Sequence, residues 1–371
     1  MVNKLQIDWL LFAVVAALSL FGVLMVYSAS AMLAIKETNG ANQFVYAIKQ
    51  FGFTVLGLFL MLLATRFDYR WLKNSAVVGT LVVAAIVLLL AVFGFGSVNG
   101  ARRWIKFGGM SFQPSELAKF SLALFLAYFF AKREKEMSSL VKTILPCALV
   151  MTALLGLVFI EPDLGTTMVM AAIFAAVYFA AGADWRHYAA AGAMFVVGVI
   201  GALVLVPWRM KRILAFLDPW ADPENSGYQL IQSLLAVGSG GIWGAGFAQG
   251  QQKIHYLPYA HSDFIFAIVC EEFGLVGALL VLFGFGVILW RGARIALAAP
   301  DRFGKLLAIG IVTGITVQAF FNMSVVIGLL PTKGIPLPFI SYGGSSILIT
   351  LLSMGVLLNI SQYAGTISDE S

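Results

Sequence analysis

The chain has 371 residues, of which 60% are hydrophobic and 11% are charged, and its formal net charge is +6. Soluble domains carry roughly 25% charged residues, so this composition excludes a water-soluble globular protein and favours a chain that folds in lipid. The Lys and Arg residues fall in short segments between apolar runs, which is typical of membrane-protein loops and argues against nucleic-acid binding. Both cysteines lie within apolar runs, and the three His do not combine with them at the spacing of a zinc site.

Apolar runs that are long enough to cross a bilayer predict an all-α integral membrane protein with about ten transmembrane helices. The predicted spans are residues 9–27, 50–65, 74–95, 115–131, 143–160, 164–183, 188–207, 263–290, 306–330 and 341–364. We expect a single polytopic membrane domain over residues 1–371. The first span is predicted to be retained, because its apolar run is longer than that of a signal peptide.

The distribution of Lys and Arg predicts that both termini lie on the cytoplasmic side. With this orientation the inner segments hold 13 of these residues and the outer segments hold 10. The outer cations gather at residues 102–106 and 209–212, which indicates an anionic ligand at the outer face. Residues 208–262 are predicted to form one long extracytoplasmic loop with several turn signals, within which residues 228–237 form a short amphipathic helix.

Charged side chains at membrane depth are costly, so they mark candidate functional sites. Glu116 and Lys119 lie three positions apart on one helix face, and they form either a self-neutralised pair or one wall of a polar cavity. Asp163 lies in the short link between the fifth and sixth spans. Three interpretations are open for Asp163: a solvated side chain, a cap of the following helix, or a ligand contact.

Asp263 stands where the long loop meets the eighth span. One interpretation is a helix cap. The alternative is a catalytic carboxylate, whose pKa would be raised towards the range of a useful base by burial beside Phe264 and Phe266. Glu271 and Glu272, which are deeper in the same span, are predicted to hold the bundle together.

Residues 331–346 break the helical pattern between the last two spans. Prolines at positions 331, 336 and 338 prevent a regular helix, and the glycines at 343 and 344 allow close backbone approach. Non-helical backbone at membrane depth is tolerated only where it is buried or lines a cavity. This segment is therefore predicted to form the wall of a site rather than a plain connector.

At these motifs the chain resembles the SEDS family (shape, elongation, division and sporulation proteins), and the resemblance covers nearly the whole chain. The motifs are RRW at 102–104, FQPSELAK at 112–119, PDLGT at 162–166, LDP at 217–219, GYQ at 227–229, GSGG at 238–241, HSDFIF at 261–266 and SYGGS at 341–345. The PTKG stretch at 331–334 and the GGSS ending at 343–346 look more like the division branch, FtsW, whereas Ile335-Pro336 is closer to the elongation branch, RodA.

The resemblance implies a peptidoglycan glycosyltransferase that polymerises lipid II at the outer face of the cytoplasmic (inner) membrane, with Asp263 as its essential catalytic carboxylate. The predicted substrate-binding residues are Glu116, Lys119, Asp163, Arg102, Arg103, Arg209, Arg212, Ser341 and Tyr342. The first three are implied to line one central cavity, and the arginines suit a pyrophosphate. Glu161 stands where the family often has Gln, which adds a possible negative charge.

The family also implies a partner with one membrane helix and an extracellular transpeptidase domain, a class B penicillin-binding protein, together with other division proteins and membrane lipid. No cofactor is evident in the sequence, and a divalent cation is left open. The alternatives to a division polymerase are a RodA-type elongation polymerase, a lipid II flippase and a structural scaffold. No inverted repeat of the kind common in transporters is visible, which disfavours the flippase.

Overall fold

The computed structural model describes residues 7–96, 101–107, 110–137, 139–204, 207–254 and 256–364. In this part of the chain the α-helices are α1 (Trp9–Glu37), α2 (Val45–Ala64), α3 (Ser75–Ala91), α4 (Pro114–Lys132), α5 (Leu145–Ile160), α6 (Leu164–Ala180), α7 (Trp185–Val204), α8 (Pro207–Leu217), α9 (Tyr228–Ser239), α10 (Ile265–Leu297), α11 (Arg302–Val326) and α12 (Gly344–Ser361). One antiparallel hairpin is formed by β1 (Ile105–Phe107) and β2 (Met110–Phe112), with Ile105 opposite Phe112. Short 3-10 or π turns lie at Tyr69–Lys73, Val92–Gly94, Glu134–Glu136, Leu140–Ile144, Pro219–Ala221 and Gln252–Ile254.

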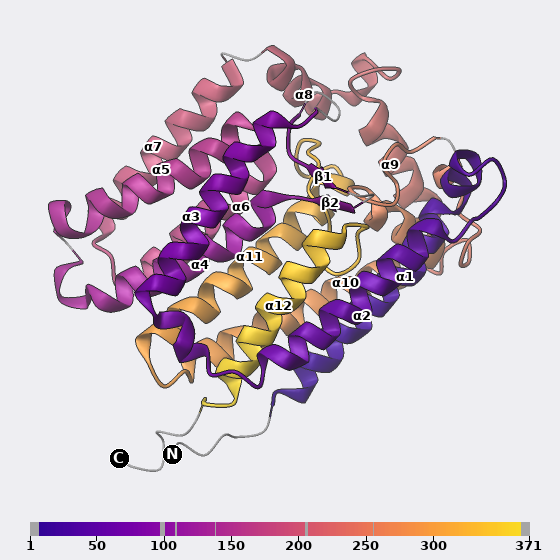
Figure 1. The fold of residues 1–371 in the computed structure, drawn as a ribbon. Helices are drawn as coiled ribbons and strands as arrows, with labels where there is room; N and C mark the ends of the chain where they lie inside the picture. The colour runs from indigo at the N-terminus through magenta and orange to yellow at the C-terminus, as the bar shows by residue number, and fades with distance from the viewer. Residues whose placement is uncertain are drawn as a thin grey trace.

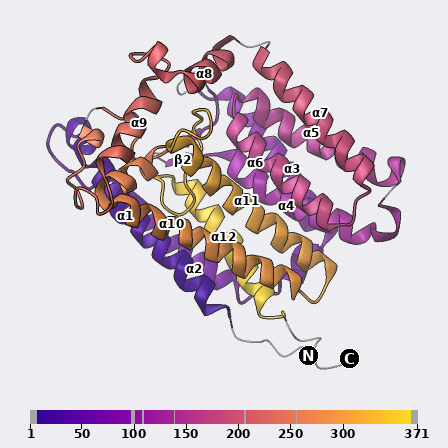
Figure 2. The same cartoon turned by 180° about the vertical axis from the view of Figure 1, so that it is seen from behind.

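Each of the ten predicted spans coincides with a helix, so the predicted all-α membrane fold is confirmed. Among the described residues, eight helices are long and apolar enough to cross a membrane, and α6 is a shorter apolar helix. The helices lie side by side as one bundle, with α7 at the edge remote from α1 and α2 (Figures 1 and 2). The start of α1 and the end of α12 meet where the Asp8 amide donates to the Ser361 hydroxyl at 3.4 Å, which fits the predicted placement of both termini on one side.

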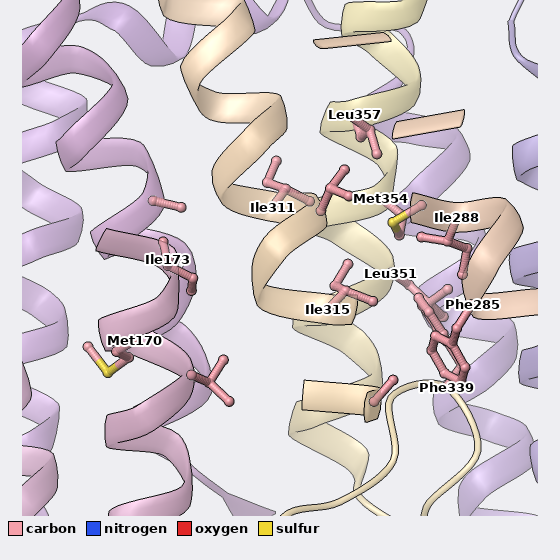
Figure 3. Close-up of a cluster of buried hydrophobic side chains, with 14 of the residues drawn as sticks. Met170, Ile173, Phe285, Ile288, Ile311, Ile315, Phe339, Leu351, Met354 and Leu357 are labelled. Atoms are coloured by element: carbon pink, nitrogen blue, oxygen red, sulfur yellow. The ribbon is translucent and has the colours of Figure 1, made fainter. Parts of the chain in front are cut away.

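The core is centred on α11 and α12, whose apolar windows are 72% and 83% buried, compared with 22% for α3. Figure 3 shows Ile311 and Ile315 of α11 between side chains of α6 on one side and of α10 and α12 on the other. Phe339, from the segment before α12, stacks on Phe285 of α10 with ring centroids 6.2 Å apart. The non-helical segment 331–343 is therefore anchored in the core.

The β hairpin, α8 and α9 gather at the end of the bundle opposite the chain termini (Figure 1). The predicted short helix at 228–237 is confirmed as α9. The helix α8 lies in what the sequence predicts as loop, because three cations at residues 209–212 interrupt the apolar pattern at its start.

The helix α10 is interrupted at Gly274, which adopts a φ of 63° that favours glycine. The loop after α9 fits into this break. The amides of Leu275 and Val276 donate to the carbonyls of Gly241 and Ile242, at 2.9 and 3.2 Å. The freed backbone groups of a broken membrane helix need such partners.

Glu271 and Glu272 also bind this loop through their side chains. Glu271 Oε1 accepts hydrogen bonds from the amides of Gln251 and Gln252, at 2.6 and 3.0 Å. Glu272 Oε1 pairs with Lys253, whose ammonium is also buried. These contacts agree with the structural role predicted for the two acids and specify what they hold: the loop that leads to Asp263.

Candidate functional site

Asp263 lies in the turn before α10, at the end of the bundle that carries the hairpin and α8. A Cβ added to Gly334 would lie 2.8 Å from Asp263 Oδ2 and 3.9 Å from Nη1 of Arg103, so this position leaves no room for a side chain beside the carboxylate. Burial raises the pKa of Asp263 to about 6; Arg103 and Arg212 oppose the rise, and Asp163 adds to it. The helix-cap interpretation of Asp263 is wrong, because Phe264 is the residue before α10 and no side chain caps that end.

Arg103 is held by the hairpin between α5 and α6. Its Nε donates to the Glu161 carbonyl at 3.4 Å, and its guanidinium also donates to the Pro162 carbonyl. Nη1 lies 3.9 Å from Asp163 Oδ1. Asp163 in turn caps α6, since its Oδ1 accepts the Thr166 amide at 3.1 Å. The predicted cap is thus confirmed, and the same carboxylate also faces a cation of the site.

Glu161 is fully buried, and within the described part of the chain neither of its carboxylate oxygens has a hydrogen-bond partner. Burial is the main cause that raises its pKa to about 8, and the charge of Asp163 raises it further, while Arg103 lowers it. The side chain is therefore mostly neutral at pH 7. The extra negative charge considered from the sequence is largely absent at that pH.

A cavity of about 590 Å³ opens beside this group, within the size range of small-molecule sites. Its lining comes from α5, α6, α7, α8 and the 331–334 segment. The cations at its edge are Arg103, Arg212 and Lys333, and most of the remaining wall is apolar. Arg212 Nη1 donates to the Thr332 carbonyl at 3.5 Å, which ties α8 to the opposite wall. The arrangement suits an amphiphile with an anionic head and a long apolar tail.

Glu116 and Lys119 line a different, smaller cavity of about 40 Å³ between α4, α6, α11 and α12. They form an ion pair with Lys119 Nζ 2.9 Å from Glu116 Oε1, and the lysine also donates to Gln318. The structure thus brings Asp163, Arg103, Arg212 and Asp263 together but sets this pair apart in a separate pocket.

The other predicted binding residues lie elsewhere. Arg102 is exposed and donates to the carbonyl of Phe93 at 2.9 Å, away from Arg103. The Arg209 side chain lies outside what the structure describes. Ser341 and Tyr342 contact the backbone just before Asp263 rather than the large cavity.

Three residues near the site were missed as site residues. Lys333 lies two residues after Pro331, in a segment that was predicted as a site wall, and this position could have identified it. Gln318 and Asn322 are buried amides in an apolar span, four residues apart and therefore on one face of α11. Among the described residues, no group of three or more His, Cys, Asp or Glu is placed to hold a metal ion.

Comparison with known proteins identifies the class. The family model of cell cycle proteins that groups FtsW, RodA and SpoVE matches residues 8–366. A probable peptidoglycan glycosyltransferase FtsW from Geobacter metallireducens is 42% identical over 95% of this chain and 94% of its own length. Stage V sporulation protein E of Bacillus subtilis is 40% identical over 98% of this chain and 99% of its own.

Solved structures agree with the fold. A chain from a peptidoglycan synthase complex that coordinates polymerization and crosslinking aligns with a TM-score of 0.77 and 32% identity, covering 96% of this chain and 98% of that one. The rod shape determining protein RodA of Thermus thermophilus aligns with a TM-score of 0.70 and 30% identity, covering 96% and 97%. The chain is thus a multi-pass membrane protein of the SEDS class. It belongs to the FtsW/RodA/SpoVE family, as its motifs predicted.

Proposed function

We propose that this protein is a peptidoglycan glycosyltransferase that polymerises lipid II at the outer face of the cytoplasmic membrane during cell division. The observation that carries the proposal is the placement of Asp263: Arg103 and Arg212, which line a largely apolar cavity, act on its carboxylate, and it lies against Gly334 of the cavity wall. The identity to FtsW-type relatives supports the division role over elongation. Lipid II combines a sugar, a pyrophosphate and a polyprenyl tail, and the site offers a matching surface for each.

In this proposal Asp263 is the general base. It accepts the proton of the acceptor sugar's hydroxyl as the oxygen attacks the donor's anomeric carbon, and the bond from that carbon to the pyrophosphate breaks. A single displacement of this kind converts an α link into a β link. A base works best when its pKa lies near the operating pH, and burial brings that of Asp263 to about 6.

The leaving pyrophosphate needs cations that are already in place where water is scarce. Arg103 meets this need, because three consecutive residues of the 161–163 hairpin hold its guanidinium. Arg212 and Lys333 add positive charge from the other walls of the cavity. The apolar side chains of α5 and α6 then accommodate the start of the polyprenyl tail.

We further propose that a class B penicillin-binding protein and other division proteins act with this chain, because crosslinking needs a transpeptidase domain. No resident cofactor is expected. A chelator added to the assay tests whether a divalent cation assists.

The test is polymerisation of purified lipid II by the purified protein in detergent, with glycan strands resolved on a gel, alone and with the penicillin-binding protein. The proposal predicts strands longer than a disaccharide without any sealed vesicle. A flippase moves lipid between two compartments, so a protein that translocates lipid II in vesicles but makes no strands under either condition would overturn the proposal.

A further inference from the structure

The backbone that carries Asp263 is fixed by three successive hydrogen bonds. The carbonyls of residues 261, 262 and 263 each accept one bond from the C-terminal third of the chain. The donors are the Tyr342 amide at 3.0 Å, the Ser341 hydroxyl at 2.6 Å and the Asn322 side-chain amide at 2.7 Å. The first two come from the turn before α12, and the third comes from α11.

Two of these donors also contact the 331–338 segment: the Ser341 hydroxyl accepts the Leu337 amide at 2.7 Å, and Asn322 makes a second contact from α11. Its Nδ2 also donates to the Ile335 carbonyl at 2.7 Å, so both N–H groups of one amide are used. Because both acceptors are carbonyl oxygens, the orientation of the amide is determined by its partners. The residue is only 2% exposed, and it therefore joins the Asp263 turn to the 331–338 segment inside the protein.

Gln318, one helical turn earlier on the same face of α11, repeats the contact. Its Nε2 donates to the Pro336 carbonyl at 2.9 Å, and its Oε1 accepts from Lys119. Two consecutive carbonyls of a proline-rich segment are thus held by two buried amides of one helix. The Glu116–Lys119 pair is linked to that segment through Gln318, rather than through the large cavity.

This attachment bears directly on the site, because the held segment contains Gly334. A Cβ added to that glycine would lie 2.8 Å from Asp263 Oδ2, and its neighbours Thr332 and Lys333 line the large cavity. The segment has no regular secondary structure of its own, so its distance from Asp263 depends on what holds it. Loss of the Asn322 amide would leave two carbonyls without their donor and would free the segment from the Asp263 turn.

We propose that Asn322 is a positioning residue that fixes the Asp263 turn and the 331–338 segment at one separation, with Gln318 as the second point of attachment. The inference rests on the proposed function, in which Asp263 is the base. Asn322 acts through Asp263 and Gly334 and makes no contact with substrate in this account.

The variants Asn322→Leu and Gln318→Leu test the proposal in the purified, full-length protein. Leu is close in size to both residues and donates no hydrogen bond. The matched control is Thr316→Val, because Thr316 is equally buried on α11 but, among the described residues, its hydroxyl bonds only to the carbonyl of Val312 in its own helix. Thermal stability of each variant is measured alongside polymerisation.

We expect Asn322→Leu to lower kcat at least tenfold with KM changed less than twofold, and Gln318→Leu to have a smaller effect of the same kind. The acid limb of the pH–rate profile should move to lower pH, because a loosened segment admits water to Asp263. The charged groups that act on Asp263 (Arg103, Asp163 and Arg212) are all retained, so the shift reports the change in burial. Lower stability alone would reduce the amplitude of the profile without moving it.

An Asn322→Leu protein with the kcat and acid limb of Thr316→Val would overturn this inference. If that variant is too unstable to purify, the same readouts on Gln318→Leu decide the matter. Failure of the proposed function has a different signature: an Asp263→Asn protein that keeps its activity, whatever Asn322→Leu does.

Discussion

The Glu161→Gln variant should remove most of the fall in this protein's stability between pH 6 and 8, because Asp263, whose pKa is raised to about 6, adds to the fall mainly at lower pH. Glu161 is buried, and neither carboxylate oxygen has a hydrogen-bond partner among the described residues. Its pKa of about 8 in the folded protein compares with an ordinary 4.5. Gln has nearly the same shape and carries no charge at any pH, so it removes the titration while it preserves the packing.

The direction in which stability changes with pH follows from proton binding. Because the pKa is raised by folding, the folded protein binds more protons than the unfolded chain between these two values, and stability falls as pH rises through that window. The free energy of unfolding falls by about 1.4 kcal/mol for each pH unit between the two pKa values. The total loss across the window is therefore at most about 5 kcal/mol. Relaxation of the site at high pH reduces the observed value.

The assay is the thermal unfolding temperature of the detergent-solubilised protein, measured at half-unit steps from pH 5 to pH 9. Ionisation of Glu161 should lower the unfolding temperature of the wild type as pH rises across this range. The decrease should be much smaller in Glu161→Gln. The control is Asp184→Asn, since Asp184 is exposed. Parallel curves for wild type and Glu161→Gln would refute the reasoning, because they would mean that the buried carboxyl does not titrate in this window.

Three further predictions concern the site and the loop that leads to it. Polymerisation by the wild type should rise with pH through an apparent pKa near 6, which is that of Asp263; a rate that is flat from pH 5 to 8 would contradict the role of this base. Gly334→Ala should lower kcat at least tenfold with little change in unfolding temperature, because the added methyl group displaces the carboxylate, whereas Gly286→Ala meets no described atom within 4 Å and should be neutral. Lys253→Met leaves a buried carboxylate unpaired and should cost roughly 3–5 kcal/mol of stability, whereas Lys142→Met breaks an exposed pair and should cost under about 1 kcal/mol; equal effects would count against the loop attachment.

Much of the fold was predictable because a helix that crosses lipid needs a long apolar run, and such runs are visible in the sequence. Each charge-poor run in the sequence became a helix, and α9 was visible from its amphipathic pattern. The helix α8 was not visible, since a short cationic helix at the bundle end resembles a solvated loop.

The arrangement of the site could be predicted from the sequence only in part. Asp163 and Asp263 were singled out because charge near the membrane is costly, and the structure shows that Arg103 interacts with both. The sequence does not reveal that Glu116 and Lys119 occupy a separate pocket, because that depends on how α4 is rotated against α11. The same rotation determines that Gln318 and Asn322 face the 331–338 segment.

The most direct test of the central assignment is lipid II polymerisation by purified Asp263→Asn protein. Asn keeps the shape of the side chain but has no basic carboxylate, so substrate binding should survive while strand formation falls to background. The matched control is Asp68→Asn, because Asp68 is exposed and its role as acceptor for the Arg70 amide can be filled by Asn. The account predicts no strands from Asp263→Asn and normal strands from Asp68→Asn; strands of normal length and rate from Asp263→Asn would contradict it.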